Sequence, residues 1–320
     1  MKFSRALVIV SIMATLGLSS CGDPATRSAK ALYAKAVSLP KALDAKDLNP
    51  DIRRMLELAS ATARYAADSY GLAESAGMLR FLPGSRGNLA WRLAASKPDS
   101  VTALEIKYFI DEPAAVAFSE ELAVKGIAFY VEPYESLRWA IAEPAPLLES
   151  FSSWPYEKLV EWVFLQIFEN ACAGSKSPDG LKGFPVFAAE KATIEFLTAQ
   201  LSAASPVVAR YTSERRDTRT FSVLYDDYRV RFEELYAQNP LPADTPKRRE
   251  ILSSTWLAEY RSSYSNRFLT NLYSAFGDQP VSNAHMAAWV NRYAEWKRLE
   301  KQYSSQGKNL KGFIESALAQ

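Results

Sequence analysis

Histidine is almost absent from this 320-residue chain, which contains one, His285, together with two cysteines, Cys21 and Cys172. Zinc sites take most of their ligands from these two residue types, so a metal site here would have to be built from very few side chains. A Ser-His-Asp triad would need the same single imidazole, and no Gly-x-Ser-x-Gly motif accompanies any serine. The Gly-Lys-Ser/Thr ending of a phosphate-binding loop is absent too. The usual signatures of serine hydrolases and nucleotide-binding proteins are therefore missing.

An excess of charge is also lacking. The chain has 38 basic and 36 acidic residues, and residues 1–20 contain two of the basic ones, so the chain from Cys21 onward carries 36 of each sign. Nucleic-acid binding requires a strong basic excess, and none is present. With 48% hydrophobic and 12% aromatic residues, the chain is instead able to bury a large core.

The only long uncharged apolar run lies at the start, where Ala6 to Leu18 follow Lys2 and Arg5. This is the anatomy of an export signal, and the run is too short to span a membrane. The sequence Leu18-Ser19-Ser20-Cys21 resembles the lipobox of bacterial lipoproteins. We expect residues 1–20 to be a lipoprotein signal peptide, although a plain signal peptide followed by an incidental cysteine is the alternative.

A lipid on Cys21 would anchor the chain to a membrane, with the rest of the protein in an aqueous compartment of the bacterial cell envelope. Gly22, in place of the Asp of an inner-membrane retention signal, favours the outer membrane. Cys172 would then have no intrachain disulfide partner.

The pattern of the first half predicts helices and a small sheet. Residues 21–48 are expected to be a lipid-anchored tether, and Asn49-Pro50 to begin a helix that Gly71 ends. Short alternating or β-branched runs predict three strands, and a helix ended by Gly126 is expected before the last of them. The predicted strands are 88–95, 101–110 and 127–132, and the predicted helix is 111–125. Prolines prevent long regular elements in 133–155.

The run from Glu157 to Gly174 is apolar on nearly every side, so a helix here would be buried at the centre of the core. The helices expected after it are 188–203, 206–238 with one possible break, 246–276, 283–302 and 310–319. The sequence thus predicts a mostly helical α+β fold over 49–320. In it a small sheet packs on a buried central helix (49–174) and a helical bundle follows (188–320). The many aromatic side chains of the second half are expected to form helix-packing core.

Several motifs of the chain are familiar together. They are Ile52-Arg53-Arg54-Met55-Leu56-Glu57-Leu58 with Tyr70-Gly71-Leu72, Tyr108-Phe109 with Asp111-Glu112, Phe129-Tyr130-Val131 running into Pro133-Tyr134-Glu135-Ser136-Leu137-Arg138-Trp139, and Pro280-Val281-Ser282-Asn283-Ala284. From about Asp51 to its end the chain resembles a family of bacterial predicted zinc aminopeptidases that carry H-E-x-x-H on a buried helix. In that motif two His one turn apart bind zinc, and the Glu between them activates its water.

Carried over from the resemblance, the two ligand positions fall on Phe168 and Cys172 and the general base on Glu169. The family's third ligand, a Glu, falls on Val186 or Lys182. Only the base is retained, so the resemblance implies a degenerate member without zinc, although zinc is expected for the family. A metal site rebuilt from Glu169, Cys172 and His285 is conceivable, but nothing in their spacing ties them together. Glu169 on an apolar helix needs a partner, and Arg138 is a candidate.

Three functions remain open at this point. The first is a lipid-anchored, catalytically inactive relative that binds a peptide or an envelope protein along a strand edge. The expected groove residues are Phe129, Tyr130, Val131, Tyr134, Leu137 and Trp139. The second is an active aminopeptidase with the rebuilt metal site. The third is a structural envelope protein whose cleft is filled, with Phe168 in the former metal volume.

Overall fold

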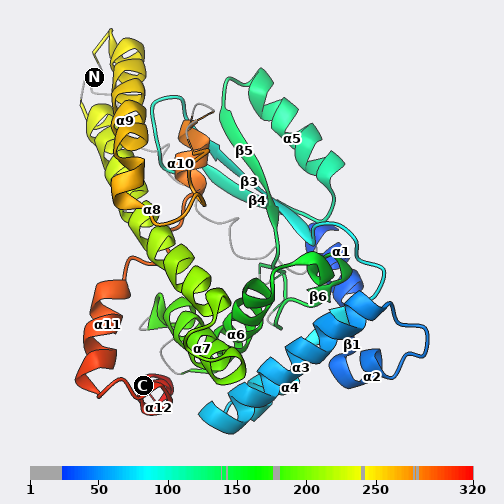
Figure 1. Cartoon of the computed structure of the whole chain (residues 1–320). Helices are drawn as coiled ribbons and strands as arrows, with labels where there is room; N and C mark the ends of the chain where they lie inside the picture. Colours follow the sequence, from blue (N-terminus) through cyan, green and yellow to red (C-terminus); the bar gives the residue numbers. More distant parts are fainter. Residues whose placement is uncertain are drawn as a thin grey trace, which may run out of the picture.

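The computed structural model describes residues 24–137, 139–141, 143–175, 181–238, 242–276, 278 and 281–319, and the structural statements below concern these residues. Residues 1–20, Cys21 and Arg138 lie outside them. The helices are α1 (Pro24–Tyr33), α2 (Leu39–Leu43), α3 (Pro50–Tyr70), α4 (Ala73–Gly77), α5 (Glu112–Val124), α6 (Tyr156–Ala173), α7 (Phe184–Leu201), α8 (Pro206–Tyr236), α9 (Thr245–Arg267), α10 (Asn283–Ala288), α11 (Trp296–Ser305) and α12 (Leu310–Leu318) (Figure 1). The mostly helical α+β class is confirmed.

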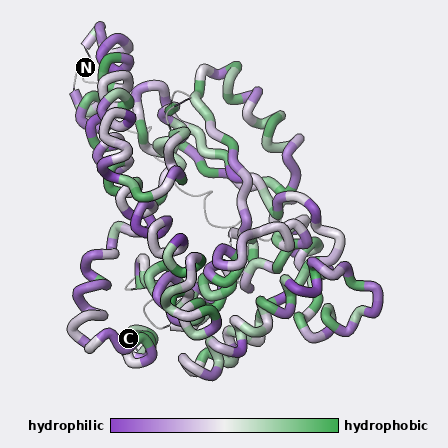
Figure 2. Tube along the Cα trace, in the orientation of Figure 1, coloured by the Kyte–Doolittle hydropathy of each residue, from purple (hydrophilic) through white to green (hydrophobic). Residues whose placement is uncertain are grey.

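The main core is built around α6, which packs chiefly against α7 and α3. Phe164, Ile167 and Phe168 of α6 are fully buried, as the apolar run of the sequence predicts. The three helices lie together in the lower half of Figure 1, and α6 and α7 are strongly hydrophobic in Figure 2. The start of α3 is fixed by Asn49, whose Oδ1 accepts from the Asp51 N–H at 2.8 Å, and its end by Gly71 at φ +72°. Helices α3 and α6 therefore begin and end close to the residues that the sequence predicts.

The predicted three-stranded sheet is present as β4-β3-β5, with β3 (Ala90–Ser96) in the middle and antiparallel to both β4 (Glu105–Phe109) and β5 (Ala128–Tyr134). Its packing differs from the expectation. It has α5 on one face and α10 on the other rather than α6 (Figure 1). A small separate cluster, with Leu93 and Leu122 at its centre, joins the sheet to α5. The apolar side chains on one face of the sheet thus pack against α5. The other face packs against α10 and also carries the polar side chains of the strands.

The stretch for which the sequence predicts a tether contains α1, α2 and β1 (Val37–Ser38), the first strand of a second sheet. The sheet has the order β1-β2-β6, from β1, β2 (Arg80–Leu82) and β6 (Leu147–Leu148), which the 3-10 helix Glu149–Ser153 follows. Val37 is paired with Phe81, and Leu39 and Ala42 of α2 are buried in the main core. Residues 24–48 are therefore part of the folded domain, because their apolar residues fit a face of α3 and β2.

The second half is dominated by α8, which is unbroken and forms a long hairpin with α9 (Figure 1). Buried carboxylates connect α8 to the main core: Glu157 of α6 accepts from Arg210 Nε at 2.9 Å, and Glu190 of α7 pairs with Arg219. An aromatic cluster fills the far half of the hairpin, as expected. Its largest buried members are Phe221, Tyr225, Tyr228, Phe232, Trp256 and Tyr260.

Two aspartates of α8 explain why the last helices are shorter than predicted. Asp217, fully buried, accepts from the backbone N–H of Leu269 at 2.9 Å and of Thr270 at 2.7 Å, so α9 ends at Arg267. Asp226 accepts from Trp289 Nε1 at 3.0 Å and from the Asn291 side chain at 2.5 Å. Residues 289–293, which we call the clamped segment, are consequently held extended or in turns between α10 and α11.

No helix in the described part of the chain is long and apolar enough to cross a membrane.

Candidate functional site

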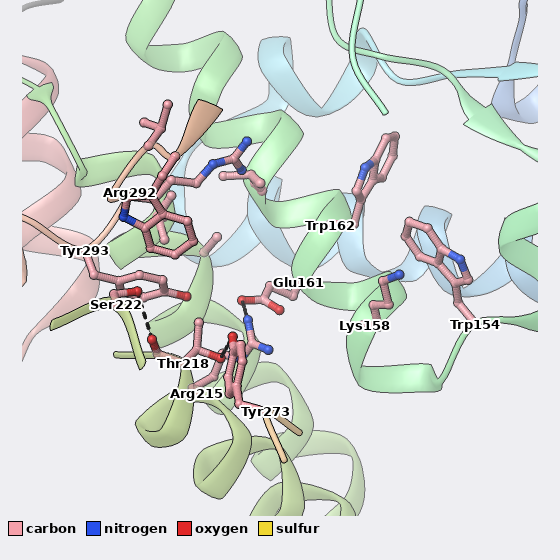
Figure 3. Close-up of a pocket in the computed structure, with 15 residues that line it drawn as sticks. Trp154, Lys158, Glu161, Trp162, Arg215, Thr218, Ser222, Tyr273, Arg292 and Tyr293 are labelled. Carbon is pink, nitrogen blue, oxygen red and sulfur yellow. Dashed lines mark hydrogen bonds and ion pairs between the residues drawn. The ribbon is translucent and has the colours of Figure 1, made fainter. Parts of the chain in front are cut away.

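Two adjoining cavities form one cleft between the three-stranded sheet, α6 and the clamped segment. The larger, about 670 Å³, is lined by β3, β4, β5, α6 and α10, and we call it the sheet-side cavity. The smaller, about 340 Å³, is lined by α6, α7, α8 and the clamped segment, and we call it the helix-side cavity (Figure 3). The residues common to both are Trp162, Leu165, Trp289, Val290 and Arg292.

The sheet lines the sheet-side cavity with Arg92 of β3, Ile106 and Tyr108 of β4, and residues 132–134 of β5. Most of these are two apart along their strand and so share one face of the sheet. Arg92 of β3 lies opposite Glu132 of β5, and Arg92 Nε donates to Glu132 Oε1 at 2.6 Å. The same guanidinium donates to the Ala288 carbonyl at 2.9 Å, which ties the sheet to α10. Tyr108 and Tyr134 complete this face with ring centroids 5.2 Å apart. The wall is thus aromatic, with its main ion pair already satisfied.

Helix α6 presents Leu165, Gln166 and Glu169 to the sheet-side cavity. Both polar atoms of the Gln166 side chain form hydrogen bonds. Its Oε1 accepts from the Ala145 N–H at 2.9 Å, and its Nε2 donates to Glu169 Oε2 at 3.5 Å. Leu165 and Glu169 are four residues apart and lie on one side of the helix. An H-E-x-x-H motif on this face would therefore place its imidazoles at these two positions and its Glu at Gln166.

The ligand positions carried over from the resemblance, Phe168 and Cys172, line neither cavity. Phe168 is fully buried in the main core, where its ring centroid lies 6.2 Å from that of Tyr70 and 6.4 Å from that of Phe184. Cys172 is buried farther along α6 in the same core. Phe168 and Cys172 thus face the packed core, whereas Leu165, Gln166 and Glu169 face the cleft.

Glu169 does line the cleft, as predicted, whereas the third predicted ligand position has no metal donor there. Val186 lines the helix-side cavity, and Lys182 lines neither cavity. The missed positions Leu165 and Gln166 had one usable signal in the sequence. Gln166 and Glu169 are among the few polar side chains in the second half of α6, and polar residues in an apolar run can indicate which side meets a cavity.

His285 is in the wall of the sheet-side cavity, with its ring centroid 4.3 Å from that of Tyr130. Burial lowers the pKa of this imidazole below its usual value. Cys172 does not line the cavity, so the rebuilt set of Glu169, Cys172 and His285 is not assembled there. No group of three His, Cys, Asp or Glu side chains in the described part of the chain could hold a metal ion. The donor set of the cleft therefore does not fit zinc.

Of the predicted groove residues on β5, alternate side chains face opposite sides of the sheet. Tyr134 lines the sheet-side cavity, and Tyr130 faces the same side against His285. Val131 packs in the cluster under α5, and Phe129 is exposed. β5 is an edge strand, with β3 as its neighbour in the sheet order.

Farther along, Leu137 is fully buried in the main core, and Trp139 stacks on Tyr108 with centroids 5.2 Å apart. Between them and β5, Glu135 lines the sheet-side cavity. Burial raises the pKa of Glu135, and the positive charges of Lys158 and Arg292 oppose this shift. Of the predicted groove residues, Tyr134 thus lines the sheet-side cavity, and the others lie behind its wall or face elsewhere.

The helix-side cavity contains a partly buried ion pair. Arg215 of α8 donates through Nη1 to Glu161 Oε1 of α6 at 3.1 Å (Figure 3). Burial raises the pKa of Glu161, and Arg215 opposes the shift. Lys158 Nζ lies 3.7 Å from the centroid of the Trp154 ring, and Tyr273 donates its hydroxyl to Thr218 Oγ1 at 3.1 Å. This cavity combines positive charge with indole and phenol rings.

A family model described as a putative aminopeptidase matches residues 25–319. Comparisons with curated proteins and with solved structures find no match. The matched range includes the cleft, both sheets and residues 25–48 that precede the long first helix.

Proposed function

Because the chain belongs to the putative aminopeptidase family, we propose that it uses the cleft of that fold to bind peptides without hydrolysing them. The observation that carries the proposal is the side of α6 that faces the cleft. Leu165, Gln166 and Glu169 stand where a zinc peptidase needs an imidazole, a carboxylate and an imidazole. A leucine cannot bind a metal, and an amide is no general base.

Peptide binding is supported by the shape of what remains. The sheet-side cavity, at about 670 Å³, lies over the face of the sheet formed by β3, β4 and β5, of which β5 is an edge strand. An edge strand can pair with an extended peptide through its backbone, while side-chain pockets supply specificity. Tyr108, Tyr134 and Trp162 line the cavity and offer apolar surface to alternate peptide side chains. An open cavity at this place favours this role over that of a structural protein with a filled cleft.

The proposal includes attachment to a membrane of the bacterial cell envelope through a lipid on Cys21, with the outer membrane favoured. Helix α1 begins at Pro24, three residues after Cys21. A lipid at that position would hold the folded domain directly at the bilayer surface, and the cleft would receive peptides from the surrounding aqueous compartment.

The test measures binding and hydrolysis on the same protein. Calorimetry with short peptides should detect binding that Tyr134→Ala weakens about fivefold, in line with the loss of one aromatic contact. Phe129→Ala is the matched control, since Phe129 is an exposed aromatic residue of the same strand that faces away from the cavity. Amino-acid release should stay undetectable with and without added zinc. Release that a chelator abolishes would overturn the inactive assignment, and no binding of any peptide would overturn the rest.

A further inference from the structure

The two cavities of the cleft carry opposite net charge. The helix-side cavity is lined by Lys158, Arg215 and Arg292 against the single carboxylate of Glu161, which gives 3 − 1 = +2. The sheet-side cavity is lined by three carboxylates and two guanidinium groups, which gives 2 − 3 = −1 with His285 neutral. Arg292 is counted in both because it stands at their junction. A ligand with charges of both signs would therefore bind in one direction.

Pairing within the protein does not cancel the positive charge of the helix-side cavity. Glu161 forms an ion pair with Arg215, so the other two cations of the cavity, Lys158 and Arg292, have no carboxylate partner in its wall. Arg215 Nε is buried and has no hydrogen-bond partner among the described residues. Lys158 lies over the Trp154 ring, and both Lys158 and Arg292 act electrostatically on Glu135, which belongs to the wall of the other cavity. Lys158 and Arg292 are thus two cations that line the helix-side cavity without a carboxylate partner inside it.

The remaining walls of this cavity are mostly apolar and aromatic, with the hydroxyl groups of Thr218 and Ser222 among them. The indole rings of Trp154, Trp162 and Trp289 and the phenol of Tyr273 line it. Figure 3 shows Trp154 and Trp162 on the side of Lys158. Aromatic walls bury a large apolar side chain well. Lys158 and Arg292 are themselves exposed to solvent, so their attraction for a carboxylate is strongest at low ionic strength. The volume of about 340 Å³ is in the range of small-ligand sites.

We propose that the helix-side cavity is a subsite for a carboxylate next to an aromatic or bulky apolar side chain, and that the cleft therefore selects short peptides by their acidic end. This inference rests on the proposed peptide-binding function. The carboxylate can be the free C-terminus of a peptide or an acidic side chain within one. The peptide's amino end then lies in the sheet-side cavity, where Glu135 and Glu169 supply negative charge.

The experiment compares the tripeptide Ala-Ala-Phe with a free C-terminal carboxylate, the same tripeptide as its C-terminal amide, and the amide of Ala-Glu-Phe, by calorimetry at low salt. We expect the acid to bind about tenfold more tightly than the amide, the effect of one charge-assisted contact. If the Ala-Glu-Phe amide binds as tightly as the acid, the subsite accepts an acidic side chain. If it binds only as weakly as the Ala-Ala-Phe amide, the subsite requires the C-terminal carboxylate.

The Lys158→Gln variant should bind acid and amide with nearly equal affinity while its affinity for the amide stays as in the parent protein. Lys297→Gln is the matched control, because Lys297 is an exposed lysine of α11 that lines neither cavity. Equal binding of acid and amide by the parent protein, or a preference that survives in Lys158→Gln, would overturn the subsite and leave peptide binding in place. Failure of all three peptides to bind would remove the proposed function itself and the subsite with it.

Discussion

Gln166 occupies the cleft position at which a hydrolytic relative would need a carboxylate, and both ends of its amide are in use. The bond from the Ala145 N–H fixes the proline-rich segment before α6, and the bond to Glu169 fixes the neighbouring carboxylate. The side chain therefore has a structural role at a position that could otherwise hold a catalytic base.

The register of the lost motif can be tested by rebuilding it. The triple variant Leu165→His, Gln166→Glu, Glu169→His should bind zinc more tightly than the parent protein, because its two imidazoles share one side of α6 and face an open cavity, although the third ligand of a zinc peptidase site is still missing. The comparison variant is Phe168→His, Cys172→His, which should bind none. It should also lose about 3–5 kcal/mol of stability, as for other disruptions of a buried Phe.

Metal analysis after gel filtration and urea unfolding give the two readouts. Stoichiometric zinc in the comparison variant, with none in the triple variant, would restore the register that the sequence alone predicts.

His285 makes a pH-dependent contribution whose sign follows from its lowered pKa. The unfolded chain takes up a proton near pH 6.5, whereas the folded protein does so only at lower pH. The unfolded state thus binds more protons in this window, and stability falls as the pH falls through it. We expect the parent protein to lose stability relative to His285→Asn between pH 7 and 5. Parallel urea midpoints for the two proteins across this range would refute the assignment.

Among the elements, those with local signals could be predicted from the sequence and those fixed by distant residues could not. Asn49-Pro50 and Gly71 define α3 locally, and the apolar run defines α6. The ends of α9 and α10 depend on Asp217 and Asp226 of α8, which are more than 50 residues away in the chain. No pattern near Arg267 or Trp289 indicates those contacts. Which side chains of α6 face the cleft could not be predicted either, because the orientation of α6 depends on its packing against α3 and α7.

Asp217 should prove important for the element that follows α9. Its carboxylate accepts from the N–H groups of Leu269 and Thr270 and from the Thr270 hydroxyl. Asp217→Ala would leave these donors unpaired, and we expect a loss of about 2–4 kcal/mol in the free energy of unfolding. Asp227→Ala is the control, since Asp227 is an exposed aspartate of the same helix and pairs with Arg231 one turn away. Equal urea midpoints for the two variants would contradict the role assigned to Asp217.

At the scale of the whole molecule, the domain begins earlier than the sequence suggests. The expected tether lacks a long apolar run, and its short helices are stable only through packing against α3 and β2. Deletion of residues 24–48 should therefore lower the free energy of unfolding by about 3 kcal/mol or more, through exposure of the core that Leu39 and Ala42 cover. Removal of residues 1–20 alone is the control. Thermal unfolding that is identical for both truncations would mean that the segment is dispensable.

The clamped segment separates the two cavities, yet Trp289, Val290 and Arg292 are walls of both. If a ligand bound in one cavity displaces these residues, the shape of the other cavity changes as well. A small ligand in one cavity should therefore change the affinity of the other cavity for a second ligand, depending on how it displaces the Trp289 side chain. The hydrogen bond from Trp289 to Asp226 limits that displacement.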